Sequence, residues 1–265
     1  MLSHTNPMRE VARDRNPQYF VASLRQYVFA PLSTAARRVD REQTELTAER
    51  NAYEAFDDCL QSITSEAPPP RQRPAASISR HKQQVGKTDR LRTTYEETVM
   101  DISHYERVYG EPLVEHVSRE FHAKFASGFK HTTSIPFTAE YKRALRQQVR
   151  QAIERRKDML GTLREESQAI SDACTSLKDI SMPLQTTIIP EWHTESFTTK
   201  LNTVSKQRQK VLRTRDSIDH IDVHSLCAYL YADESWTYPV LTAVARMRET
   251  VSLEPSHLKA SKTDA

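Results

Sequence analysis

The sequence contains very little glycine, with 4 residues in a chain of 265. An average composition would give about 19. Phosphate-binding loops, dinucleotide-binding turns and nucleophile elbows need residues that tolerate a positive φ or a close backbone approach. The four residues stand far apart in the chain, as Gly86, Gly110, Gly128 and Gly161. The sequence therefore excludes glycine-rich loops of these kinds and favours long helices with few turns.

Cysteine pairs, a signal peptide and long apolar runs are also lacking. Cys59, Cys174 and Cys227 are odd in number and include no CxxC pair, which is typical of unpaired thiols in a reducing compartment. The first ten residues lack the apolar segment of a signal peptide. No apolar run approaches the roughly 20 residues that a membrane helix needs. We expect a cytoplasmic protein with no membrane contact.

Charge is abundant but balanced. Lys and Arg number 38 and Asp and Glu 35, for a formal net charge of +3. Charged residues make up 28% of the chain, apolar residues 37%, and the mean hydropathy is -0.68. Apolar residues must therefore gather on narrow stripes of amphipathic helices. The net charge is too small to indicate nucleic acid by itself.

Heptad spacing of apolar residues predicts two long helices. In the first, over residues 33–64, apolar residues recur every seventh position, beginning after Pro31, which should interrupt a preceding short helix. This series is Val39, Leu46, Tyr53 and Leu60, with Phe56 and Ile63 alongside. The second helix, from Ala139 to about Ile180 with Thr138 as its cap, carries two series broken only by Arg156 and Glu166. These series are Val149, Arg156, Leu163, Ile170 and Leu177, and Ala152, Met159, Glu166, Ala173 and Ile180.

Breaks and further helices complete the predicted architecture. Gly110 and Pro112 mark the end of one helix and the start of the next, whose apolar positions run from Leu113 to Phe125. A helix from about 195 to 219 should fold back on the longest one, and no segment alternates convincingly enough to be a strand. We predict an all-α fold, an elongated antiparallel helical bundle with coiled-coil segments. Its predicted parts are an N-terminal leader and short helix (1–32), a heptad helix (33–64), a disordered proline-rich linker (65–87), a helical bundle (88–255) with a coiled-coil hairpin (139–219), and a polar tail (256–265).

Two stretches are strongly basic. Residues 142–157 hold seven basic residues and one acidic residue, and residues 200–215 hold six basic residues and no acidic one, a net +6 each. Residues 37–58 carry a net -3, so this helix is a natural partner for a basic one. Ion pairs along packed helices account for the pattern, and contact with nucleic-acid phosphates is the alternative. The candidate phosphate contacts are Arg143, Arg146, Arg150, Lys206, Arg208 and Arg213.

Candidate metal sites are weaker. His220, His224 and Cys227 have a spacing that could place zinc ligands on one helix face. Asp222, which we expect to cap the helix, instead leaves His220 outside it. Asp101 and His104 resemble half of a di-iron ligand set, and are more simply explained as helix-end groups. We assign no catalytic residue, metal or cofactor.

Aromatic residues lie close together around the predicted Gly110 turn. Tyr105, Tyr109, Phe121 and Phe125 could form a platform for stacking bases. The phenylalanines fall at helical spacing on an apolar stripe, which favours core packing instead.

Three segments of the sequence carry a resemblance to a known family. They are APLSTAARRVDREQTELTAERNAYEAF from Ala30, YEETVMDISHYERVYGEPLVEHVSREF from Tyr95 and YLYADESWTYPVLTAVA from Tyr229. Together they resemble a haloarchaeal family catalogued only as a domain of unknown function. The resemblance covers about Ala30 to Val251. It implies a mostly helical, coiled-coil-containing cytoplasmic protein of a salt-loving archaeon, and it implies no activity or ligand.

These observations predict a non-enzymatic interaction or scaffold protein with no cofactor and no small-molecule substrate. A protein partner or a second copy of the chain would complete the seams that Arg156 and Glu166 interrupt. The alternative is a nucleic-acid-associated protein that contacts phosphates through residues 142–157 and 200–215.

Overall fold

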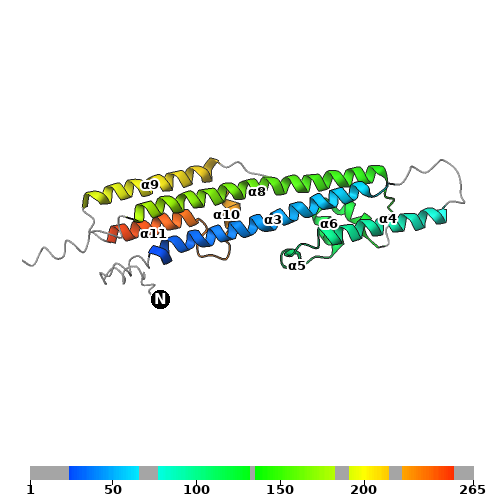
Figure 1. Cartoon of the computed structure of the whole chain (residues 1–265), viewed down its shortest axis with the longest axis horizontal. Coiled ribbons are helices and arrows are strands. Elements are labelled where there is room, and N and C mark those ends of the chain that lie inside the picture. Colours follow the sequence, from blue (N-terminus) through cyan, green and yellow to red (C-terminus); the bar gives the residue numbers. More distant parts are fainter. Residues whose placement is uncertain (1–23, 66–76, 132–134, 183–190, 215–222, 254–265) are drawn as a thin grey trace, which may run out of the picture. The chain divides into compact units, whose positions relative to one another are not determined.

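The computed structural model describes residues 24–65, 77–131, 135–182, 191–214 and 223–253. In these ranges the regular structure is helical and no β-strand occurs, so the all-α prediction is confirmed (Figure 1). None of the described helices combines the length and the apolar character that crossing a membrane would need.

The chain forms two compact units. The first comprises residues 1–42 and 162–265, and the second comprises residues 43–161. Helices α3 (Ala30–Ser62) and α8 (Ala139–Ser181) each contribute one part to each unit. On α8 the boundary follows Gly161, where an added Cβ would have no neighbour within 4 Å. The division therefore differs from the predicted heptad helix, linker and single bundle.

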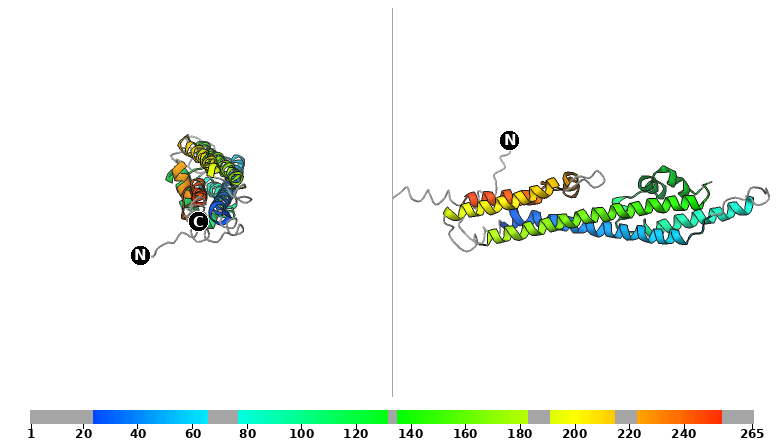
Figure 2. Two further views of the ribbon diagram at one scale, coloured as in Figure 1. Left: turned by 90° about the vertical axis from the view of Figure 1, so that its left-hand side faces the viewer. Right: turned by 90° about the horizontal axis from the view of Figure 1, so that it is seen from above.

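The first unit combines the start of α3 and the end of α8 with four further elements. A π-helical turn, η1 (Leu24–Phe29), precedes α3, and α9 (Glu191–Thr214), α10 (Val223–Leu230) and α11 (Pro239–Leu253) follow α8. Helices α9 and α11 pack side by side (Figures 1 and 2). Pro31 does not interrupt a helix as predicted. It is the second residue of α3, where an α-helical N–H has no partner to lose.

The second unit combines the end of α3 and the start of α8 with shorter helices. These are α4 (Ser77–Thr98), α5 (Tyr105–Val108), α6 (Leu113–Phe121), α7 (Ala123–Ala126) and a 3-10 turn, η3 (Ser127–Phe129). The prediction of a disordered linker over 65–87 is wrong for residues 77–87, which form the first half of α4 and include Gly86. All four prolines of that segment precede Ser77, and the residues after it include good helix formers.

Aromatic side chains fill the core of the second unit. The ring of Tyr95 meets Phe56, Phe129 and Phe121 edge-on, with centroids 4.9, 5.5 and 6.2 Å away. All four rings are fully buried. Such edge-to-face contacts stabilise the core beyond the burial of area alone.

Two glycines have conformational roles in this unit. Gly110 has φ +54° and ends α5, as predicted. At Gly128 an added Cβ would overlap the ring of Tyr141, whose hydroxyl donates to the carbonyl of Phe125. The predicted helix through Leu113 and Phe125 is broken at His122, an exposed residue with φ 76° and ψ 153°. Residues with side chains rarely adopt this backbone conformation.

Candidate functional site: buried ion pairs and two basic helices

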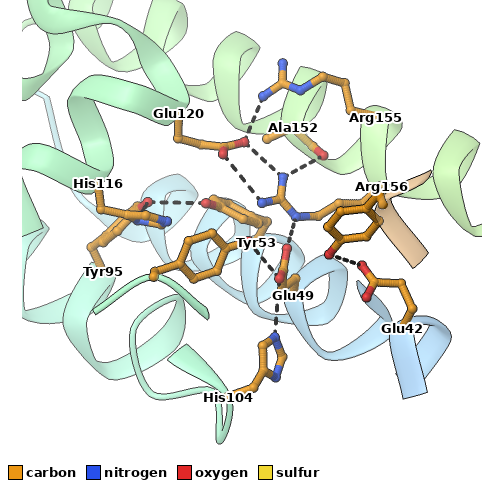
Figure 3. A network of polar contacts seen from close by, with 12 residues as sticks. Glu42, Glu49, Tyr53, Tyr95, His104, His116, Glu120, Ala152, Arg155 and Arg156 are labelled. Atoms are coloured by element: carbon orange, nitrogen blue, oxygen red, sulfur yellow. Dashed lines mark hydrogen bonds and ion pairs between the residues drawn. The ribbon is translucent and has the colours of Figure 1, made fainter. Parts of the chain in front are cut away.

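Arg156, a predicted interruption of the α8 seam, lies at the centre of a polar network in the second unit (Figure 3). Its Nε donates to Glu49 of α3 at 2.8 Å, and its Nη1 donates to Glu120 of α6 at 2.9 Å. The guanidinium also lies over the ring of Tyr53, 4.3 Å from the centroid. One buried cation therefore connects three helices of this unit.

Both carboxylates of the network have further donors. Glu49 accepts from the hydroxyl of Tyr109 at 2.8 Å and lies 3.3 Å from Nε2 of His104. Glu120 also accepts from Arg155 at 2.8 Å. Burial alone would raise the pKa of Glu120, but the charges and hydrogen bonds of the two arginines outweigh it and lower that pKa. Glu120 therefore carries its negative charge beside Arg156 at neutral pH.

A chain of hydrogen bonds lies beside this cluster. The hydroxyls of Tyr53 and Tyr95 are 3.4 Å apart, and Tyr95 is 3.0 Å from Nδ1 of His116. His116 is 1% exposed, and burial lowers its pKa to about 4, so its imidazole is neutral at pH 7. Burial also raises the pKa of both tyrosines. Tyr53, Tyr95 and His116 therefore do not change charge near neutral pH, which suits a structural role better than general acid–base catalysis.

A second buried ion pair holds the first unit together. Both terminal nitrogens of Arg208 on α9 donate to Glu166 on α8, at 2.8 and 2.9 Å, and the two side chains are 2% and 0% exposed. The hydroxyl of Tyr231 donates to the same carboxylate at 3.3 Å. Nε of Arg208 is buried and has no hydrogen-bond partner among the described residues. The planar fork of arginine fits this two-point contact, which sets the register of α9 on α8.

These contacts correct one prediction. Arg156 and Glu166 do not leave gaps for a partner to fill, because helices of the same unit supply their counter-ions. The predicted pairing of the basic residues 142–157 with the acidic segment of α3 is confirmed, since Arg146 binds both oxygens of Asp57 at 2.7 and 2.9 Å.

The six candidate phosphate contacts do not form one surface within either unit. The α8 residues lie in the second unit and the α9 residues in the first. Arg208 is buried, and Arg146 and Arg150 both contact Asp57. The remaining three, Arg143, Lys206 and Arg213, are exposed.

Neither predicted set of metal ligands is assembled among the described residues. His220 and the side chain of His224 lie outside the described residues, while Cys227 is buried against Arg208 at 3.7 Å. His104 stands at a helix end as predicted, at the N-cap position of α5, but its ring is buried against Glu49, whereas Asp101 is exposed. Across the described ranges, no three potential ligands converge on a common point.

The aromatic residues around the Gly110 turn belong to the core, as favoured. Tyr105, Phe121 and Phe125 are 2, 0 and 3% exposed.

Sequence reasoning missed Glu49, Glu120 and His116. Glu49 carried a usable signal, because it precedes Phe56 by seven residues and so occupies the buried stripe of α3. Glu120 and His116 lie four residues apart on α6, beside the apolar positions of that helix. Their part in the polar network could be recognised only once the structure placed α6 against α8.

A family described as "Domain of unknown function (DUF7260)" matches residues 30–253. The chain belongs to this family. The match begins at the first residue of α3 and ends at the last residue of α11, so it covers all of the second unit and the helices α3, α8, α9, α10 and α11 of the first. No curated protein and no solved structure matches the chain significantly.

Proposed function

We propose that this DUF7260 protein is a non-enzymatic interaction or scaffold protein that associates through the heptad seam of α3 and α8. One observation carries the proposal. Every heptad position that we assigned on these helices is buried except Leu46 and Met159, which are partly exposed apolar residues.

The two residues occupy matching places in the second unit. Three contacts join α3 to α8: Ile63 with Lys142, Asp57 with Arg146, and Glu49 with Arg156. The residue numbers decrease along α3 as they increase along α8. The two helices are therefore antiparallel here, and continuing the series places Leu46 opposite Met159. Two partly exposed apolar side chains at one level of a seam form a contact that a second helix could cover.

The buried ion pairs support a scaffolding role. Arg156 and Glu166 hold neighbouring helices in fixed register, as polar groups in a seam do. Their charges are neutralised within the units, so association would rely on the apolar positions. We expect the partner to be a second copy of the chain or another helical protein, in a cytoplasmic setting.

Light scattering on the full chain tests this proposal. We expect a mass above the 30.5 kDa of one chain, increasing with protein concentration and persisting at high salt, because the contact is apolar. The double variant Leu46→Gln/Met159→Gln should reduce the mass to that of one chain. Val108→Gln, at an exposed apolar residue outside the seam, is the matched control and should associate like wild type. A monomer at every concentration and ionic strength would refute the proposal.

A further inference from the structure

Helix α9 has one buried stripe and one broad exposed face. The buried residues recur at spacings of three and four: Phe197, Leu201, Val204, Arg208 and Leu212. The opposite face exposes Lys206, Lys210 and Arg213, and the exposed Lys200 lies at the edge of this face. The only basic residue turned inward is Arg208, which is neutralised by Glu166.

From Ser196 onward, the exposed face of α9 carries positive charge without acidic residues. No Asp or Glu occurs between Ser196 and Thr214. Lys200, Lys206 and Arg213 have no counter-ion among the described residues. In the same unit, residues 162–181 of α8 mix exposed charges of both signs. The exposed charges of α9 after Ser196 are thus of one sign, unlike those of this part of α8.

The other basic stretch has a different environment. In residues 142–157, each basic residue except Arg143 contacts a carboxylate or backbone carbonyl. These contacts are Lys142 with the carbonyls of Gln61 and Ile63, Arg146 and Arg150 with Asp57, Arg155 and Arg156 with Glu120, and Lys157 with Glu154. Among the described residues of the two stretches, the second therefore has three exposed cations without a counter-ion, Lys200, Lys206 and Arg213, and the first has one, Arg143.

The geometry of the α9 face suits a row of phosphates. Lys206 and Arg213 stand at i and i+7, which places them on one side of the helix at an axial separation of roughly 10.5 Å. Exposed hydroxyl and amide groups lie among them, including those of Thr199, Thr203, Gln207 and Gln209. Such groups donate hydrogen bonds to phosphate oxygens without reading the base sequence.

The same face lacks the features that other anionic partners require. Between residues 195 and 213, no exposed side chain is aromatic, so unpaired bases would have no stacking surface. No large apolar side chain is exposed there either, and membrane-binding helices insert such side chains between lipids. A duplex presents regularly spaced phosphates and keeps its bases stacked, which fits a purely polar basic face.

We propose that the exposed face of α9, with Lys206 and Arg213 as its principal cations and Lys200 at its edge, binds the phosphate backbone of double-stranded nucleic acid without sequence preference. The inference goes beyond the association at Leu46 and Met159 and uses different residues. Arg208, Arg146 and Arg150 take no part, because their charges are neutralised within the protein.

Fluorescence anisotropy with the full chain and a labelled 20-base-pair DNA of arbitrary sequence tests the proposal. We expect binding that weakens steeply as KCl rises from 20 to 300 mM, with equal affinity for a second, unrelated duplex. In Lys200→Gln/Lys206→Gln/Arg213→Gln, affinity should drop about tenfold or more, and the slope of log K against log salt should decrease by about 2 to 3.

A charge-matched triple variant separates this face from net charge. Arg90→Gln/Lys130→Gln/Arg143→Gln removes the same number of positive charges from exposed residues of the second unit and should retain wild-type affinity. Circular dichroism melting confirms that both triple variants fold. An equal loss of affinity in the two variants, or no binding at 20 mM KCl, would overturn the proposal.

Two further measurements test whether a lipid surface or a second copy of the chain binds this face instead. Tighter binding to phosphatidylglycerol vesicles than to the duplex would overturn the proposal in favour of a lipid surface. Salt-sensitive self-association that disappears in the α9 variant would overturn it in favour of a second copy. Leu46→Gln/Met159→Gln should still bind DNA, so a failure of the association proposal is distinguishable from a failure of this one.

Discussion

The two units each bury an arginine, but they neutralise it differently. In the second unit Arg156 faces two carboxylates, Glu49 and Glu120, and these have additional donors in Tyr109, His104 and Arg155. In the first unit the described counter-ion of Arg208 is Glu166 alone. The buried arginine of the second unit therefore has two carboxylate partners, whereas that of the first unit has one, which also accepts a hydrogen bond from Tyr231.

How strongly a substitution in a buried ion pair destabilises the protein depends on the partners that remain when one member is removed. Breaking a buried pair leaves an uncompensated charge, which costs far more than the pair contributes over an apolar replacement. A second carboxylate keeps the remaining cation paired. We therefore expect the first unit to be the more fragile of the two towards neutral substitutions.

The largest effect should come from Glu166→Gln. This substitution leaves Arg208 buried without a counter-ion and should reduce the free energy of unfolding of the first unit by about 3–5 kcal/mol. Urea denaturation monitored by circular dichroism measures the loss. The double variant Glu166→Leu/Arg208→Met removes both charges and should recover most of it. A double variant less stable than Glu166→Gln would contradict this explanation.

Acid should weaken the second unit next. The pKa of His116 is lowered to about 4 in the folded state, against about 6.5 in the unfolded chain. Between these values the unfolded state binds more protons, so stability is retained above pH 6.5 and is lost as pH decreases towards 4. The loss approaches about 3 kcal/mol at the lower end.

The variant His116→Gln isolates this contribution, since an amide can still hydrogen-bond Tyr95 but does not titrate. Urea denaturation at pH 7 and pH 5 should show a smaller decrease in the variant than in wild type. The pKa of Glu120 and of Asp57 is also lowered, but those carboxylates lose their contribution only below their unfolded pKa, near 4. Identical pH dependence in wild type and variant would count against the buried neutral imidazole.

Glu49→Gln should have a moderate effect. Arg156 keeps Glu120, and the new amide oxygen can still accept from Tyr109, so we expect a loss of about 1–2 kcal/mol. Chemical denaturation compares this value with that of Glu166→Gln. A loss as large as that of Glu166→Gln would remove the argument from redundancy.

Gly161→Ala should have the smallest effect and the opposite sign. The residue lies inside α8 at the boundary of the two units, and an added methyl group meets nothing within 4 Å. Helix propensity then favours alanine by about 1 kcal/mol. We expect the midpoint of thermal unfolding to increase by several degrees at most. A decrease would reveal that this boundary needs the flexibility of glycine.

Local signals in the sequence predicted much of the helix pattern. Thr138 caps α8 as predicted, with its hydroxyl accepting from the backbone N–H of Tyr141 at 3.1 Å. The turn at Gly110 was also predictable, because it depends on local backbone preferences. The break at His122 was not, since the apolar spacing from Phe121 to Phe125 continues through it.

The candidate sites were harder to predict because they depend on contacts between distant residues. Arg156 and Glu166 were recognisable as interruptions, but their counter-ions lie on other helices, as far as 107 residues away along the chain. A heptad pattern gives the face of a helix without the identity of its neighbour. The sequence likewise did not indicate which basic residues are exposed, because this depends on packing. Arg208 is buried, whereas Lys206 is exposed to solvent.

Native-state hydrogen exchange on wild type and Glu166→Gln tests the central claim most directly. Amides of α9 and α11 report on the first unit, and amides of α4 and α6 report on the second. The account predicts that the substitution strongly reduces protection in α9 and α11 while α4 and α6 keep most of theirs. An equal loss of protection in all four helices, or no loss in α9, would contradict the claim that each unit relies on its own buried ion pair.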